Sequence, residues 1–132
     1  MNSAIFLSSP TGTYKLDAAR LFEHPLPVGL VVLSACESGG GTAEAGDDFL
    51  GLARSFYLGG AAAMINSLWP VYDRPTQSYM VTFHKQAKSG DYGKAWIAAR
   101  DMLKAQGFPP SIYGAFVLGG ALQSPRDSSL QR

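Results

Sequence analysis

Cys36 is the residue of this chain best placed to do covalent chemistry. It is the only cysteine among 132 residues, and it stands between the apolar run 30–33 and the glycines 39–41. Glycines let a substrate backbone come close, and free backbone N–H groups in such a loop can hold the oxyanion of an acyl transfer. A lone cysteine is more often a small buried hydrophobe, so both interpretations stay open at this point.

A reactive thiol needs a base or a positive field, because an ordinary cysteine is only a few per cent thiolate near neutral pH. The sequence offers His24 and His84. His24 precedes the expected strand that leads to Cys36, which puts it at the opposite end of that strand, and His84 falls inside an expected helix. We expect both to be ordinary surface or half-buried histidines.

Apolar runs and periodic segments alternate along the chain. The run 29–34 is continuously apolar, as in a strand buried on both faces of a parallel sheet. We expect strands at 4–7, 29–34, 61–67 and 112–118. We expect helices from Asp17 to about 22, from Asp47 or Asp48 to 58, from about Asp73 or Pro75 to 88, and from Asp91 to about 106. This order predicts an α/β sandwich with a mostly parallel sheet. Reacting groups gather at the carboxyl ends of such strands, where Cys36 is expected.

Composition narrows the class of protein. Apolar residues make up 46% of the chain, charged residues 16%, and the formal net charge is +1. One compact domain over residues 1–122 is expected, followed by a flexible polar tail at 123–132. Near-neutral charge argues against a nucleic-acid partner, and the apolar runs are too short to cross a membrane. One cysteine forms no internal disulfide, so we expect a cytoplasmic protein.

Metal and cofactor motifs do not emerge from the sequence. Glu44 and Asp47 lack metal-ligand spacing with a histidine. The glycines 39–41 are not followed by the lysine-threonine pair of a phosphate loop. We therefore expect no metal and no cofactor, and a nucleotide-binding α/β domain is disfavoured because its glycine fingerprint is missing.

The segment Leu-Val-Val-Leu-Ser-Ala-Cys-Glu-Ser-Gly at 30–39 resembles the cysteine motif of CHAT domains, which are relatives of caspases and separase. Segments 51–56, 59–61 with 67–71, and 113–119 resemble later parts of the same family in the same order. The resemblance extends over roughly residues 3 to 120.

This resemblance implies a caspase-like three-layer sandwich that is incomplete at its N-terminus. It implies that Cys36 is the nucleophile of a Cys–His dyad that cleaves peptide or protein substrates through an acyl-enzyme. In the related caspases the histidine lies about 50 residues before the cysteine, which falls upstream of Met1. The missing stretch would carry central strands, the histidine and part of the oxyanion hole, so we expect little activity from this chain alone.

The resemblance also suggests the substrate side of the site. Glu37, Trp69 and Asp73 are the candidate substrate-binding residues, and Ser34 and Gly39 belong to the loop that would form the oxyanion hole. Each has a structural alternative: Glu37 as an exposed carboxylate, Trp69 as a buried anchor for its loop, and Asp73 as a helix cap.

The rival function is a non-catalytic interaction module or degenerate pseudo-peptidase, which pairs with a partner or with itself through an open sheet edge.

Overall fold

The computed structural model describes residues 4–33 and 44–125, and for residues 44–50 it describes the backbone alone. The chain forms two compact units, residues 1–28 with 39–61 and residues 29–38 with 62–132. The helices and strands make a mixed α/β protein, as predicted.

The first unit begins with a β-hairpin of β1 (Ala4–Ser9) and β2 (Gly12–Asp17), paired antiparallel. Gly12 has a φ of 133°, which glycine adopts readily in such a turn. The prediction of a strand at 4–7 and a following turn is confirmed, but the second strand was missed. Its residues do not form the apolar run that identified the other strands, and all but the last two are exposed.

Helices α1 (Ala18–Glu23) and α2 (Glu44–Leu58) complete this unit. The carboxylate of Asp17 caps α1 as predicted, because it accepts a hydrogen bond from the Arg20 N–H at 3.1 Å. The predicted start of α2 is wrong: the helix begins at Glu44, so Asp47 and Asp48 lie inside it and are not its cap. The glycines at 59 and 60 end α2 as expected, and Gly60 has a φ of 102°.

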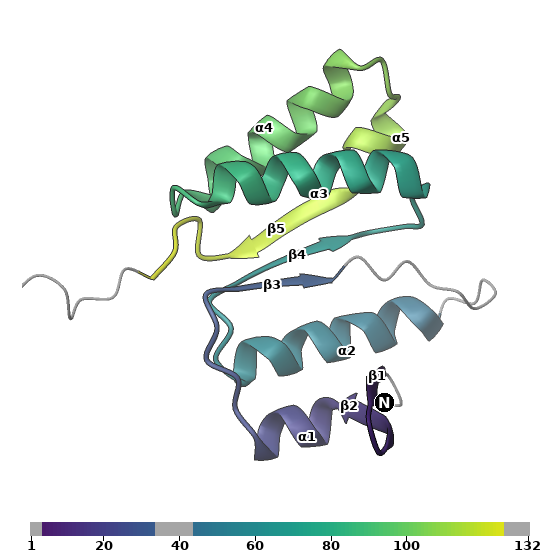
Figure 1. Cartoon of the computed structure of the whole chain (residues 1–132), viewed down its shortest axis with the longest axis vertical. Helices are drawn as coiled ribbons and strands as arrows, with labels where there is room; N and C mark the ends of the chain where they lie inside the picture. Colours follow the sequence, from purple (N-terminus) through teal and green to yellow (C-terminus); the bar gives the residue numbers. More distant parts are fainter. Residues whose placement is uncertain (1–3, 34–43, 126–132) are drawn as a thin grey trace, which may run out of the picture. The chain divides into compact units, whose positions relative to one another are not determined.

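The second unit contains a three-stranded sheet in the order β3-β4-β5, formed by Leu30–Leu33, Ala63–Ser67 and Phe116–Gly120. β3 runs parallel to β4, whereas β5 runs antiparallel to β4 (Figure 1). The expectation of a mostly parallel sheet is therefore met by one of the two strand pairs. The reason is that two helices, rather than one, connect β4 to β5. One helix crosses the sheet and the next returns, so β5 starts at the end where β4 stops.

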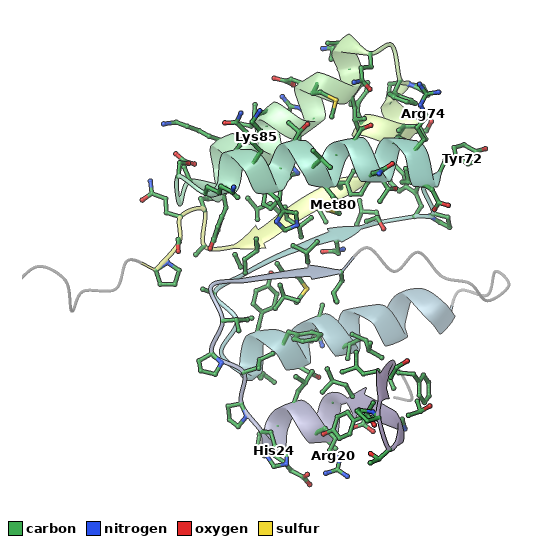
Figure 2. All side chains as sticks on the ribbon, viewed as in Figure 1. Arg20, His24, Tyr72, Arg74, Met80 and Lys85 are labelled. Atoms are coloured by element: carbon green, nitrogen blue, oxygen red, sulfur yellow. The ribbon has the colours of Figure 1, made fainter. Side chains whose placement is uncertain are left out.

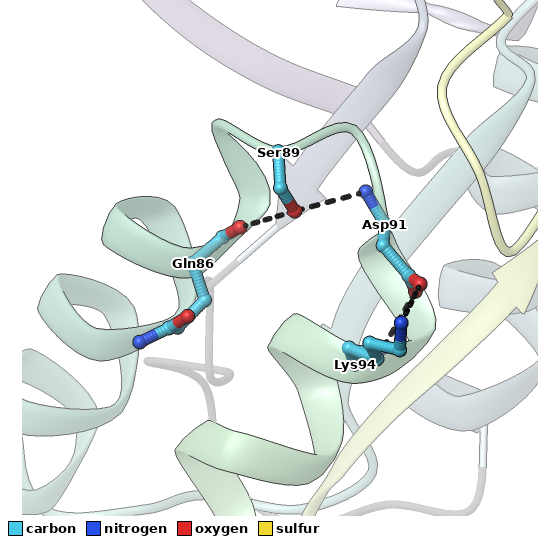
Figure 3. Close-up of polar contacts among 4 residues, drawn as sticks. All are labelled: Gln86, Ser89, Asp91 and Lys94. Atoms are coloured by element: carbon cyan, nitrogen blue, oxygen red, sulfur yellow. Dashed lines mark hydrogen bonds and ion pairs between the residues drawn. The ribbon is translucent and has the colours of Figure 1, made fainter.

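Those two helices are α3 (Asp73–Ala87) and α4 (Tyr92–Ala105), with a short α5 (Pro110–Tyr113) before β5. Asp91 caps α4 as predicted and accepts from the Lys94 N–H at 2.8 Å, while the Ser89 hydroxyl donates to the Gln86 carbonyl at 2.9 Å (Figure 3). The prediction of a strand from residue 112 is wrong at its start. Pro110 instead opens the turn of helix, a position where its missing N–H costs nothing.

Helices α3 and α4 pack against each other and cover one face of this sheet (Figure 1). The ring of Tyr79 stacks on Phe116 with centroids 4.0 Å apart, and Phe83 lies parallel to Tyr79 at 6.3 Å. Ala95 and Ala99 have short side chains that allow α4 to approach closely. The core cluster consists of Ile65, Tyr79, Phe83, Ala95, Ala99, Leu103, Ile112, Ala115 and Phe116.

Residues 121–125 lie beside the amino end of α4. The Gly93 N–H donates to the Leu122 carbonyl at 3.0 Å, and the Ser124 N–H donates to the Gly90 carbonyl at 2.7 Å. Gln123 forms an isolated β-bridge with Asp91. Gln123 and Ser124, which belong to the predicted tail, thus have backbone partners. Residues 126–132 lie outside the described part of the chain.

Candidate active-site edge

The carboxyl ends of β3 and β4 lie at the same edge of the sheet, because the two strands are parallel and Leu33 is paired with Asn66. The chain leaves β3 at Leu33 toward Cys36 and leaves β4 at Ser67 toward Trp69. Four predicted site residues, Ser34, Cys36, Glu37 and Gly39, lie outside the described residues. Trp69 and Asp73 are described.

Trp69 forms a hydrogen bond with Ser111, 42 positions further along the chain. Its indole Nε1–H donates to the Ser111 carbonyl of α5 at 2.6 Å. The backbone N–H of Leu68 donates to the Ala115 carbonyl at 2.8 Å. Trp69 keeps 41% of its surface exposed. It anchors the loop, as the structural alternative proposed, but it is not buried. The indole fastens the loop through a hydrogen bond and leaves part of its ring open to a ligand.

Asp73 is the first residue of α3, whereas the N-cap position belongs to Tyr72, whose side chain makes no capping bond. The prediction that Asp73 caps the helix is therefore wrong. Its carboxylate lies in the first turn, where the helix dipole favours negative charge. Tyr72 is 79% exposed, and Figure 2 shows its ring extending from the end of α3 into open space, with Arg74 on the next part of the turn.

His84 does not lie close to Asp73, although both belong to α3. His84 lies on α3 eleven positions after Asp73, which is about 16 Å further along the helix axis. Its ring meets Phe83 edge-on, with centroids 5.6 Å apart. His24 is the C-cap of α1 in the other unit. His84 therefore supplies no base at the carboxyl edge of the sheet.

An open hollow of about 310 Å³ lies on the outer side of α3 and α4. It is lined by Gln77, Ser78, Val81, Thr82, Met102 and Gln106. None of the predicted site residues borders it, so it is separate from the sheet edge.

The described residues contain no group of three or more histidine, cysteine, aspartate or glutamate side chains that could hold a metal ion. In the same part of the chain, every helix is too short or too polar to cross a bilayer.

Sequence reasoning missed Leu68, Tyr72 and Ser111 as residues of this edge. Leu68 and Tyr72 carried a signal, because residues 68–72 read Leu-Trp-Pro-Val-Tyr, which is unusually apolar for a loop. Ser111 carried none, since its contribution is a backbone carbonyl.

A family model described as the CHAT domain matches residues 1–105. The chain belongs to the CHAT family. The matched range includes the segments 30–39, 51–56 and 67–71 and stops before α5 and β5 of the CHAT chain. No curated protein matches the chain, and no solved structure matches it either.

Proposed function

We propose that this CHAT chain is a segment of a caspase-like cysteine peptidase and that Cys36 is its nucleophile. The observation that supports this most is the parallel pairing of β3 with β4. Cys36 follows Leu33 by three residues, which span at most about 11 Å. That connection keeps the thiol within reach of the edge from which the Trp69 loop starts.

In the proposed reaction the Cys36 thiolate attacks the carbonyl carbon of a peptide bond. A histidine first removes the thiol proton and later gives it to the departing amine, which leaves an acyl-enzyme that water hydrolyses. The backbone between Ser34 and Gly39 contributes N–H groups to the oxyanion hole. Glu37, Trp69 and Asp73 contact the substrate peptide.

The histidine of this dyad comes from a strand that precedes the segment and pairs with β3 on the side away from β4. The residues of β3 are a continuous apolar run, typical of a strand in the interior of a sheet. Among the described residues, however, β3 pairs with β4 alone. We therefore propose that a strand ending in His-Gly pairs at this edge and completes the caspase-like sandwich.

We also propose that the protein is cytoplasmic, because a single thiol stays reduced there.

The decisive experiment compares the 132-residue chain with the same chain extended by the residues encoded upstream of it. We expect the extended chain to cleave a casein substrate and the 132-residue chain to be at least about 10³-fold slower, because it lacks the base. Cys36→Ser in the extended chain should abolish cleavage. Undiminished cleavage by that variant would exclude Cys36 as nucleophile.

Alkylation by iodoacetamide at pH 6 tests the same idea on the chain itself. Without a base, Cys36 should react at the rate of free cysteine, within about threefold, and should react faster in the extended chain. A single cysteine makes the adduct unambiguous by intact mass. Equal rates in the two chains would argue against the dyad.

A second function, a non-catalytic interaction module, is favoured by the same edge of β3, which has no partner strand among the described residues. An unpaired edge strand offers backbone N–H and C=O groups to a partner strand. Hydrogen exchange of the β3 amides, followed from low to high protein concentration, tests this. Protection that rises with concentration would support self-pairing, and exchange independent of concentration would count against it.

A further inference from the structure

Three exposed apolar side chains stand on the loop between β4 and α3. Leu68, Trp69 and Tyr72 each expose more than a third of their surface, and Val71 between them is half-buried. Exposed apolar side chains gathered in one place usually mark a binding surface, whereas single ones do not need explanation. We call residues 68–72 the apolar loop.

The apolar loop is held in place at both ends. At its start, Leu68 and Trp69 are bonded to Ala115 and Ser111, as described above. At its end, the Tyr72 carbonyl accepts two hydrogen bonds from Thr76, one from the hydroxyl at 2.9 Å and one from the backbone N–H at 3.2 Å. A loop fixed before binding loses little conformational entropy when a ligand arrives.

The support for this loop is anchored in the core and hydrogen-bonded. Ile112 of α5 is buried in the core cluster, and its N–H donates to the Pro109 carbonyl at 2.8 Å. The Gly114 N–H donates to the Pro110 carbonyl at 2.9 Å, which closes the turn that presents the Ser111 carbonyl to Trp69. The indole is thus oriented by a part of the chain that lies beyond the range of the family match.

Charge around the loop does not select a charged ligand. Residues 68–72 contain no charged side chain, and the two residues that follow, Asp73 and Arg74, have opposite signs. Both are exposed in the first turn of α3. The α3 dipole already stabilises the Asp73 carboxylate, and Arg74 opposes the approach of a basic ligand. An uncharged, apolar ligand fits this surface best.

We propose that the apolar loop binds an aliphatic side chain of a peptide substrate and so makes the site selective for apolar residues. This inference rests on the proposed peptidase function, which supplies the peptide. Leu68, Trp69 and Tyr72 are the specificity-determining residues.

The test follows the Trp69 indole N–H resonance while the chain is titrated with acetylated Ala-Ala-X-Ala amides, where X is leucine, arginine or aspartate. Trp69→Phe assigns the resonance. The second tryptophan, Trp96, donates its indole N–H to the Phe116 carbonyl inside the unit at 2.9 Å and serves as the unshifted reference. We expect the leucine peptide to bind about 5- to 10-fold tighter than either charged peptide, as partial burial of a leucine side chain predicts.

A pair of variants with the same change in charge sharpens the test. Tyr72→Asp introduces a carboxylate at an N-cap position, which aspartate favours, so the helix is retained. It should remove the preference for leucine and favour arginine. Val81→Glu is the control: it is exposed on α3, away from the loop, and precedes Lys85 by four residues, a favourable pairing. It should leave the order of the three peptides unchanged.

Equal or tighter binding of the arginine peptide to the unmodified chain would overturn the proposed selectivity, as would the absence of any Trp69 shift. An unchanged peptide order in Tyr72→Asp would also overturn it. These outcomes are separate from the fate of the peptidase proposal. Binding needs no reaction at Cys36, and an arginine-selective extended chain that loses cleavage in Cys36→Ser would still be a peptidase.

Discussion

The two units of this CHAT chain differ in how they bury apolar side chains. In the second unit, aromatic rings from α3 and β5 stack inside a helix-covered sheet, and Tyr79, Phe83 and Phe116 are almost completely buried. In the first unit, the β1–β2 hairpin leaves Phe6 67% exposed and Leu7 also outside. The contrast shows that a similar apolar composition produces a dense core only where several elements converge.

The largest expected effect comes from removing the aromatic stack of the second unit. Phe116→Ala should lower the free energy of unfolding by about 3–5 kcal/mol, because it leaves a cavity beneath the ring of Tyr79. Phe6→Ala in the hairpin should change it by no more than about 0.5 kcal/mol. Urea denaturation measures both, and similar losses in the two variants would break the comparison.

Ionisation of Tyr79 should lower the stability of the second unit at high pH. The Tyr79 hydroxyl is buried, has no hydrogen-bond partner among the described residues, and burial raises its pKa well above the usual value of 10. As pH rises, Tyr79 therefore ionises in the unfolded chain before it ionises in the folded protein. The folding stability is unaffected by Tyr79 below pH 10 and decreases as pH rises from there toward the pKa of the folded state. The loss is about 1 kcal/mol for each pH unit in that range.

Tyr79→Phe removes the ionisable hydroxyl and provides the control. The variant should equal or exceed the parent in stability at pH 7, by up to about 1 kcal/mol, since it deletes an unsatisfied buried hydroxyl. Above pH 10 its advantage should grow. Thermal denaturation from pH 7 to 11 checks this, and parallel pH profiles for the two proteins would contradict it.

Gly114→Ala tests whether the corner after α5 is as tightly packed as the core. A Cβ at this position would stand 2.8 Å from the Pro110 carbonyl oxygen, so the turn must shift. We expect a loss of about 1 kcal/mol and a displaced Trp69 indole resonance. Gly93→Ala is the matched control, because its Cβ meets only ordinary contacts at 3.6 Å or more. Equal effects of the two variants would show that the corner is loose.

The smallest effects concern the helix caps, one in each unit. Hydrogen bonds from the N–H groups of Arg20 and Lys94 lower the pKa of Asp17 and of Asp91 below the usual 3.8. Each carboxylate therefore adds stability above that pH, and the stability is lost as pH falls through the lowered pKa. Asp91→Asn should retain the cap at pH 7 and reduce the loss of stability between pH 4 and 2.

Asp17→Asn should have a weaker effect of the same sign, because α1 has six residues and α4 has fourteen. Circular dichroism over that pH range compares the two variants. A larger effect for Asp17→Asn would reverse the ranking of the units.

Local signals were sufficient to predict much of this fold. Asp17, Asp91 and the glycines at 59 and 60 act through neighbouring backbone groups, so their sequence context predicted the helix ends correctly. The features that were missed depend on distant partners. The second hairpin strand is defined by its pairing with β1, and the direction of β5 is set by the two helices before it.

In the candidate site, too, the sequence predicted local features and missed a contact with a distant partner. The sequence pointed to Trp69 and Asp73, which lie on the connection leaving the carboxyl end of β4. It did not predict the bond from Trp69 to Ser111, because a backbone carbonyl 42 positions away leaves no trace in residue types. Cys36, the residue with the strongest sequence signal, remains a proposal based on the family and on the strand that precedes it.

The antiparallel pairing of β5 with β4 has a consequence for biosynthesis. Ser67 is paired with Phe116, so one edge of β4 has no partner strand in the growing chain until β5 leaves the ribosome. The α3–α4 hairpin is local in sequence and can form earlier. The nascent chain should therefore pass through a stage with paired helices and an unfinished sheet, in which Tyr79 and Phe83 are accessible to chaperones.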